Sequence, residues 1–516
     1  MTKNLSEKYI ELDGRHLTIE RIAAIAEGGA KVRVSEAASA RVAAARNFVD
    51  ERFADGDAIY GVTTGFGRLA NVQIDPGDAA LLQLNLVRSH AAGTGAPLDE
   101  RFVRAAGVLR VNSLAAGHSG IAPATLALLV ELLNRGVTPV VPMQGSVGAS
   151  GDLAPLAHMS LLLIGEGEAY FRQERMPGAE ALARAGLKPI VLGAKEGLAL
   201  INGTQVMTGI ASLCLLYAER IADTADLIAA MSLEAYLGTD AVFDRRINAL
   251  RPHRGQRVVA ARLRRALANS EIMKSHRACG RVQDPYSFRC ISVVHGAIRD
   301  SISHVRAVTE VEANSVTDNP LVFPDDRVFL SGGNFHGEPI ALAIDFLKMA
   351  ICEFASISER RLYLLLNAEE RGLPLFLARR SGLQSGLMIV QYASAAMVND
   401  NKALAWPSSV DSIPTSAGQE DHVSMGMTSA NNLVRVLENV EGALACELLG
   451  AMAATDFRRP LRSGSGTQLL YELVRERIEP LIEDRSPAPD IETARAFIRS
   501  GSIAQICATF ASDEEE

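Results

Sequence analysis

The chain has 516 residues, of which 48% are hydrophobic and 22% are charged, as in ordinary globular proteins and too apolar for a disordered chain. Its formal net charge of −8 argues against a general nucleic-acid binder, because phosphate groups require a positive surface. The six cysteines are scattered without a CxxC pair, and HExxH and GxxxxGK(S/T) motifs are absent, so we expect reduced thiols and neither a metal nor a nucleotide site.

The N-terminal stretch predicts no targeting segment. MTKNLSEKYIELDG lacks the basic and apolar regions of a secretory signal. Further along, every apolar run is broken by Glu, Asp or Arg before it reaches the length of a membrane span. We therefore expect a cytoplasmic protein that does not associate with membranes.

The first 110 residues predict a small mixed α/β domain. Residues 9–18 alternate around Asp13-Gly14, which is typical of a short hairpin. Ser35 is a suitable N-cap for a helix, and a Gly- and Thr-rich loop follows at Tyr60–Gly67. The helix after Ser35 would bury an apolar stripe made of Val42, Ala45, Val49 and Phe53.

Residues 111–516 predict an elongated helical bundle, so the fold class is mainly α. Two long windows, between Pro189 and Pro252 and between Pro339 and Pro374, contain no proline. Apolar residues recur at helical spacing in two series, Leu347, Ile351, Phe354 and Ile357, and Leu433, Leu437, Val440, Leu444 and Leu448. Short loops rich in Gly, Ser and Pro interrupt these helices, and we expect function to reside there.

The segment from Gly145 to His158 is the most informative. Its Gly-rich first half predicts a loop, and Asp152 is a suitable N-cap for the helix that follows. Ala149-Ser150-Gly151 could cyclise if the Gly151 nitrogen attacked the Ala149 carbonyl and Ser150 then lost its hydroxyl as water. The product would be a methylidene-imidazolone, an electrophile that no ordinary side chain supplies. The alternative is a plain Gly-rich turn, and the tripeptide alone does not exclude it.

The longer string GSVGASGDLAPLAHM resembles the signature of the histidine and phenylalanine ammonia-lyase family almost letter for letter. Further matching blocks occur in the family's order, and together they span most of the chain. They are YGVTTGFG from Tyr60, NLVRSHAAG from Asn85, LINGTQ from Leu200, QDPYSFRC from Gln283, NSVTDNPLVF from Asn314, SGGNFHGEP from Ser331 and SVDSIPTSAGQEDHVSMG from Ser409.

This resemblance implies a fold and a cofactor. The family combines a mixed N-terminal part with a long helical bundle and assembles as a homotetramer whose active sites are shared between subunits. In the family the tripeptide becomes the methylidene-imidazolone, so Ala149, Ser150 and Gly151 inherit that role. The resemblance implies no diffusible cofactor, and the partner is a small aromatic amino acid.

The resemblance also implies individual roles. Tyr60 matches the tyrosine taken as the base that removes the β-proton, which requires nearby positive potential to stabilise its phenolate. Arg289 matches the arginine that binds the substrate carboxylate, a task suited to a bidentate guanidinium. The remaining matches are Asn202 and Tyr286, which support the electrophile or the substrate amine, and Gln283 and Phe335, which contact the substrate.

Two residues favour histidine as the substrate. His90 lies where the family varies with the substrate ring, and a polar pair with Ser89 resembles histidine lyases. Glu420 can accept the imidazole N–H, whereas burying it against a phenyl ring would leave a charge unpaired. The predicted activity is that of a carbon–nitrogen lyase in histidine catabolism that forms trans-urocanate and ammonia.

Other features leave alternatives open. Thr63 stands where histidine lyases usually have asparagine, and Gly418 and Gln384 are smaller departures from the histidine pattern. The RSHAAG block also resembles tyrosine aminomutases. The alternatives are therefore a tyrosine or phenylalanine ammonia-lyase, a 2,3-aminomutase of the same family, or a non-catalytic helical scaffold.

Overall fold

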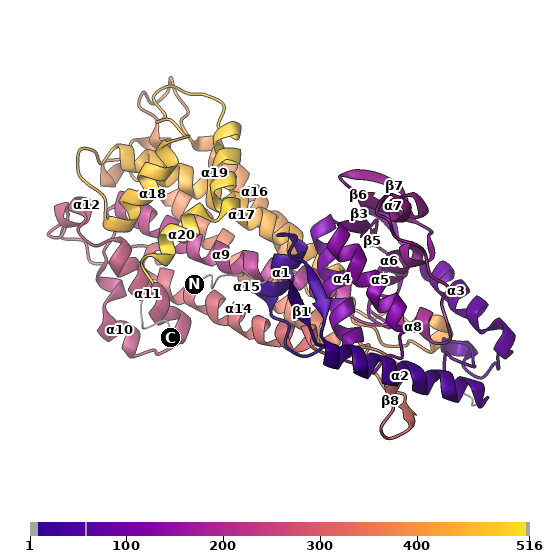
Figure 1. The fold of residues 1–516 in the computed structure, drawn as a ribbon. Coiled ribbons are helices and arrows are strands. Elements are labelled where there is room, and N and C mark those ends of the chain that lie inside the picture. The colour runs from indigo at the N-terminus through magenta and orange to yellow at the C-terminus, as the bar shows by residue number, and fades with distance from the viewer. Residues whose placement is uncertain (1–8, 57–58, 512–516) are drawn as a thin grey trace. The chain divides into compact units, whose positions relative to one another are not determined.

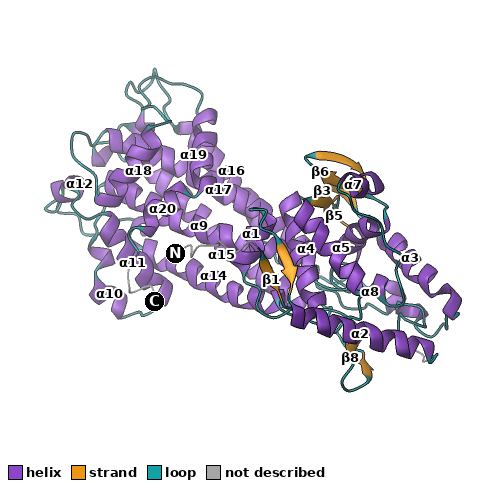
Figure 2. Cartoon of the chain, in the orientation of Figure 1, coloured by secondary structure: helices purple, strands orange, loops and turns teal. Residues whose placement is uncertain are grey.

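The computed structural model describes residues 9–56 and 59–511, and these are mostly helical (Figures 1 and 2). The mainly α prediction is confirmed. The chain forms two compact units. The first comprises the chain up to Leu216 together with Arg306–Asp345 and Pro407–Asn431, and the second comprises Tyr217–Val305, Phe346–Trp406 and the chain from Asn432 on. A domain boundary at residue 110 stays a prediction.

The first unit begins with a parallel strand pair. Strand β1 (Ile10–Leu12) pairs in parallel with β2 (Val32–Val34), so the hairpin expected at Asp13-Gly14 is wrong. The reason is that Asp13 Oδ1 accepts the backbone N–H groups of Arg15, at 2.9 Å, and His16, at 3.0 Å. This turn leads the chain into helix α1 (Ile19–Ala26) instead of returning it beside β1.

Helix α2 (Glu36–Ala54) forms as its sequence predicts. Ser35 Oγ accepts the N–H of Ala38 at 3.1 Å, and Val42, Ala45 and Val49 are buried. The other elements of this unit are α3 (Ala79–His90), β3 (Thr94–Pro97), α4 (Glu100–Ala115), α5 (Pro123–Arg135), β4 (Val137–Pro139), β5 (Pro142–Gln144), α6 (Leu153–Leu161), β6 (Glu168–Phe171), β7 (Glu174–Pro177), α7 (Gly178–Arg184), α8 (Glu196–Ile201), β8 (Leu321–Phe323) and β9 (Val328–Leu330). Antiparallel pairs join β3 to β5, β4 to β6, β6 to β7 and β8 to β9.

Four long helices each contain a boundary between the two units: α9 (Gln205–Tyr236), α14 (Ile291–Ala313), α15 (Glu338–Leu366) and α17 (Gly426–Asp456). Both predicted apolar series are buried, one in α15 and one in α17. Within the second unit, His295 on α14 bonds Asp226 on α9 at 2.8 Å, and Arg361 on α15 donates to Glu447 on α17 at 2.8 Å. A buried hydrogen bond and a buried ion pair therefore tie these helices to one another around their apolar stripes.

Shorter helices complete the second unit. They are α10 (Arg245–Ala249), α11 (Arg254–Ala266), α12 (Glu271–Ser275), α13 (Tyr286–Arg289), α16 (Met388–Leu404), α18 (Ser465–Arg475), α19 (Ala488–Ser500) and α20 (Ser502–Ala508). Across residues 9–56 and 59–511, no helix has both the length and the apolar character needed to cross a membrane.

Candidate active site

A cavity of about 1140 Å³ in the first unit brings together most of the predicted site residues. Its walls come from loops and helix ends that are far apart in sequence: the loop after α2, the end of α3, the loop before α6, the end of α8 and the loop before α17. The predicted residues that line it are Tyr60, His90, Ala149, Ser150, Asn202, Phe335 and Glu420.

The backbone around Ala149–Gly151 is sharply bent and closely packed. Gly148 and Gly151 have φ of +76° and +71°, and the two residues pair with each other across the turn. A Cβ on Gly151 would lie 2.1 Å from the carbonyl oxygen of Gly203, and one on Gly148 would lie 2.1 Å from Ser424 Oγ. Glycine is therefore required at both positions. Tight bending with small flanking groups is what cyclisation of this tripeptide demands.

The start of α9 fixes this turn on its other side. The N–H of Gly203 donates to the carbonyl oxygen of Ser150 at 3.2 Å, and the N–H of Asp152 donates to that of Gly203 at 2.6 Å. We expected Asp152 to cap α6, but its side chain makes no hydrogen bond to that helix. Instead Asp152 Oδ2 accepts the N–H groups of Val206 and Met207 at 2.7 and 2.9 Å, so it caps α9. Burial raises the pKa of Asp152 to about 7 despite these bonds.

Glu420 lies next to the tripeptide. Ser150 Oγ donates to Glu420 Oε1 at 3.3 Å, and Thr415 Oγ1 donates to Glu420 Oε2 at 2.8 Å. The loop that carries Glu420 is held against the segment around Ala149–Gly151 because the N–H of Met425 donates to the carbonyl oxygen of Val147 at 2.9 Å. Of these two donors, the Thr415 hydroxyl would remain to orient the carboxylate if Ser150 lost its own.

His90 presents one ring nitrogen for recognition. Its Nδ1 bonds the carbonyl oxygen of Leu86 at 2.9 Å, an acceptor, so Nδ1 carries the hydrogen and Nε2 is the remaining acceptor when the ring is neutral. Burial lowers the pKa of His90, and the hydrogen bond to Leu86 and the charge of Glu420 oppose that shift only in part. The neutral form is therefore favoured.

Tyr60 is placed by its own loop. The N–H of Gly67 donates to Tyr60 Oη at 3.0 Å, and the ring of Phe66 meets the Tyr60 ring edge-on with centroids 6.2 Å apart. The Tyr60 hydroxyl is therefore held at the cavity wall by a backbone donor. Thr63, in the same loop, is buried and accepts the N–H of Ile59 at 2.8 Å, so it serves the loop's structure.

Gln283, Tyr286 and Arg289 belong to the second unit and are not among the residues that line this cavity. Tyr286 is 70% exposed, and the Arg289 guanidinium lies over its ring, 4.4 Å from the centroid. Gln384 is also in the second unit, where its side chain bonds the N–H of Arg380 at 2.9 Å and the carbonyl oxygen of Ile482 at 2.9 Å. The first unit of one chain therefore supplies only some of the predicted site residues.

The sequence did not reveal several residues near the electrophile. Arg68 and Asn319 line the cavity. Lys195 and Asp318 form a buried ion pair behind Asn202. Asp318 and Asn319 lie within the NSVTDNPLVF block, which was the one available signal.

His336, Glu338 and His422 could offer a metal ion three ligand atoms, all within 4.8 Å of one another. Both ring nitrogens of His336 are already bonded, however. Nδ1 accepts the N–H of Glu338 at 3.2 Å, and Nε2 bonds the carbonyl oxygen of His422 at 3.1 Å. An ion here would have to displace one of these bonds, so the cluster is built as a hydrogen-bonded group.

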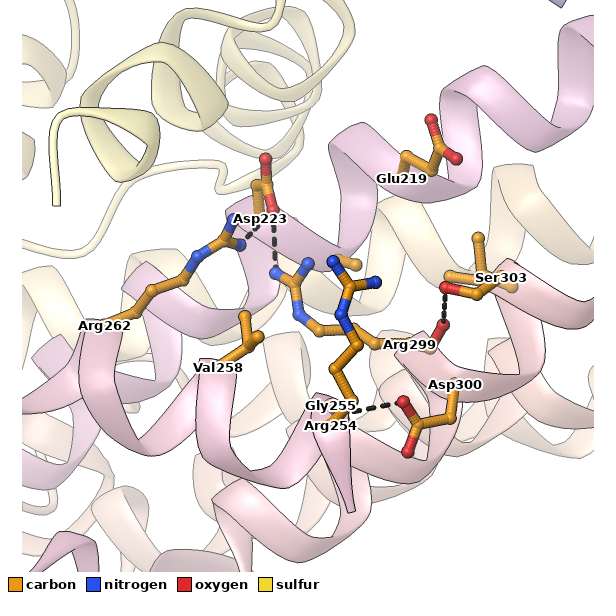
Figure 3. A pocket seen from close by; sticks show the side chains of 11 residues that line it. Glu219, Asp223, Arg254, Gly255, Val258, Arg262, Arg299, Asp300 and Ser303 are labelled. Atoms are coloured by element: carbon orange, nitrogen blue, oxygen red, sulfur yellow. Dashed lines mark hydrogen bonds and ion pairs between the residues drawn. The ribbon is translucent and has the colours of Figure 1, made fainter. Parts of the chain in front are cut away.

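A second cavity, of about 290 Å³, lies in the second unit between α9, α11 and α14 (Figure 3). Arg299 donates to Asp223 Oδ1 at 2.7 Å, and the N–H of Gly255 donates to Asp300 Oδ1 at 2.8 Å. Charged groups around this cavity pair with one another across the helices. Most of the predicted site residues line the first cavity and none lines this one.

Comparison with known proteins agrees with this geometry. A family model described as aromatic amino acid lyase matches residues 17–476. Histidine ammonia-lyase of Stigmatella aurantiaca is 52% identical, over 97% of this chain and 98% of its own. Histidine ammonia-lyase of Anaeromyxobacter sp. (strain K) is 53% identical, over 95% of this chain and 99% of its own. The structure of histidine ammonia-lyase from Trypanosoma cruzi has a TM-score of 0.91 at 41% identity and covers 98% of this chain and 96% of its own. Tyrosine aminomutase from Streptomyces globisporus also has a TM-score of 0.91, at 37% identity, with coverage of 98% and 99%.

Proposed function

Because the chain belongs to the aromatic amino acid lyase family, we propose that it removes ammonia from L-histidine and releases trans-urocanate. It is a carbon–nitrogen lyase. The observation that carries the choice of histidine is the carboxylate of Glu420, which bonds Ser150 Oγ and lines the same cavity as His90. Relatives named histidine ammonia-lyase, about half identical over nearly the whole chain, support the same choice.

The electrophile is a methylidene-imidazolone made from Ala149-Ser150-Gly151. The Gly151 nitrogen bonds to the Ala149 carbonyl carbon, and two waters leave, one from that carbonyl and one from the Ser150 side chain. Support comes from the sharp bend of this backbone and from Gly148 and Gly151, where an added Cβ would lie 2.1 Å from a neighbouring atom. This group supplies an electrophilic methylene carbon that draws electrons from the substrate amine and makes it a better leaving group.

The chain's own side chains bind the substrate and move its proton. Tyr60 Oη, stabilised by the N–H of Gly67, takes the β-proton. The imidazole, protonated on both ring nitrogens, donates one N–H to His90 Nε2 and the other to the Glu420 carboxylate, and Phe335 lines the same cavity. Asn202 holds the amine, and the products separate as trans-urocanate and ammonia.

The substrate carboxylate binds Arg289, with Tyr286 and Gln283 beside it, and we assign these three residues to a neighbouring subunit of a homotetramer. The exposure of Tyr286 supports this assignment, because such a side chain is available to another chain.

A cytoplasmic location is supported by the cysteines, which are free thiols: Cys214, Cys279, Cys290, Cys352, Cys446 and Cys507.

A mixing experiment tests the shared site. Ser150→Ala and Arg289→Met variants should each be inactive alone. Co-expressed, they should regain part of the wild-type rate, because some sites combine an intact Ser150 with an intact Arg289 from another chain. Absence of recovery in tetramers shown to contain both variants, by purification through a different affinity tag on each, would contradict subunit sharing.

The substrate itself is tested by supplying histidine, tyrosine and phenylalanine separately and following the conjugated product in the near-ultraviolet. Histidine should give the fastest rise. The tyrosine aminomutase match makes tyrosine the second candidate. A rise with tyrosine and none with histidine would transfer the assignment to a tyrosine ammonia-lyase. Release of a β-amino acid would indicate a 2,3-aminomutase.

Glu420→Gln should separate ring recognition from chemistry. We expect kcat/KM for histidine to fall about 100-fold, because a neutral amide cannot hold the imidazole N–H as a carboxylate does. Any residual activity on phenylalanine should change by no more than about threefold, since a phenyl ring offers no such partner. Asp411→Asn, which removes an exposed carboxylate from the same loop but outside the cavity lining, is the matched control and should leave histidine turnover unchanged.

A further inference from the structure

We infer that the buried pair of Lys195 and Asp318 is a positioning device that fixes the side-chain amide of Asn202, so that Oδ1 is the atom offered to the substrate's α-ammonium group. The inference rests on the proposed lyase function and extends it to two residues with no assigned role. Neither residue touches the substrate in this account. Both act through Asn202.

The contacts form a short chain of bonds behind the cavity wall. Lys195 Nζ lies 3.0 Å from Asp318 Oδ2, and the two side chains are 0% and 1% exposed. The other carboxylate oxygen, Oδ1, accepts the N–H of Asn319 at 2.7 Å and Asn202 Nδ2 at 3.2 Å. Asn202 Nδ2 also donates to the carbonyl oxygen of Asn319 at 3.3 Å.

These partners dictate which way the amide faces. A carboxylate and a carbonyl can only accept, so both require the NH₂ side of Asn202. A reversed amide would place its oxygen against two other oxygens. Asn202 Oδ1 is left buried and without a hydrogen-bond partner among the described residues. A buried acceptor is costly unless it is bonded, and an amino acid bound beside Ser150 would bring an ammonium donor.

The position of the pair in the chain explains how it holds the amide in place. Lys195 directly precedes α8 and Asn202 directly follows it, while Asp318 comes from the loop after α14. The pair thus attaches both ends of one short helix to a single carboxylate. Lys195 also has a left-handed backbone, with φ of +67°, a conformation that persists in a non-glycine residue when its surroundings enforce it.

Asp318→Asn is the direct test. The ammonium of Lys195 would attract the oxygen of the new amide and turn its NH₂ toward Asn202, whose own amide must then reverse. We expect kcat for histidine to fall about 100-fold with a smaller change in KM, because a reacting amine that is misplaced slightly loses much of its rate. The intact mass should still show the loss of two waters, since the electrophile segment is untouched.

A neutral double variant separates positioning from stability. In Lys195→Met with Asp318→Asn no ammonium competes for the amide oxygen, which can again face Asn202 and the N–H of Asn319. This variant should recover at least about 10-fold in kcat over the single variant. In an Asn202→Ala background, Asp318→Asn should cause no further loss.

The outcomes are distinct. Three results would each overturn the inference without affecting the proposed function, provided that wild-type protein turns over histidine. Asp318→Asn could have the wild-type kcat, or the Lys195→Met, Asp318→Asn double variant could be no faster than Asp318→Asn. Asp318→Asn could also cause as large a loss of kcat in the Asn202→Ala background as in wild type. Wild-type protein that turns over none of the aromatic amino acids would contradict the proposed function, and this inference with it.

Discussion

Ser150→Ala should abolish turnover, with kcat lowered by at least about 1000-fold, equivalent to about 4 kcal/mol of barrier. Without the serine hydroxyl there is no second water to lose and no methylene carbon to form. Other groups in the cavity would still bind histidine, so binding should persist while chemistry stops. Steady-state assays for kcat and equilibrium dialysis for binding measure the two separately.

The matched control is Ser160→Ala. Ser160 is a buried serine on α6, and its hydroxyl donates to the carbonyl oxygen of Leu156 at 2.7 Å, away from the cavity. Its loss should leave kcat within about threefold of wild type, because a single internal hydrogen bond contributes only about 1 kcal/mol to folding. If Ser150→Ala retained the activity of this control, the proposed mechanism would be wrong.

Tyr60→Phe should lower kcat by about 100- to 10 000-fold, the usual contribution of a positioned general base. The phenolic oxygen is the atom that receives the N–H of Gly67, so its removal also leaves that donor without its partner. The ring remains, and KM should change little. A slower release of the β-proton should then appear as a larger primary isotope effect with β-deuterated histidine.

Tyr170→Phe is the control for this variant, since Tyr170 lies on β6 and does not line the cavity. It should match wild type in kcat, KM and isotope effect. Wild-type kcat in Tyr60→Phe would remove Tyr60 from the role of base and leave the β-proton to another group.

Local sequence signals predicted the helices well because each depends on neighbours along the chain. The cap at Ser35 and the apolar series in α15 and α17 follow from spacing alone. The hairpin predicted at Asp13-Gly14 was wrong because the Asp13 side chain forms a turn that leads into a helix. A turn signature in the sequence does not show which element the chain enters next. The prediction that Asp152 caps α6 was wrong for a related reason. The sequence shows that Asp152 precedes α6, but it does not show the hydrogen bonds that Asp152 accepts from α9.

The site residues also divide into those that sequence motifs indicated and those that only the folded structure reveals. Motif blocks pointed to Tyr60, Ser150 and Glu420, and the fold gathers these around one cavity. The resemblance did not indicate that Asp318, in the NSVTDNPLVF block, fixes the orientation of the Asn202 side-chain amide. That role depends on a contact between residues 116 positions apart in the sequence. Distances of this kind follow only from the folded chain.

The mass of the tripeptide region in active wild-type protein tests the central claim most directly. A peptide spanning residues 149–151, released by proteolysis from enzyme of measured histidine turnover and analysed by mass spectrometry, should be lighter than its sequence mass by two waters. A peptide of full sequence mass from fully active protein would show that the catalyst works with an unmodified backbone, and would contradict the account.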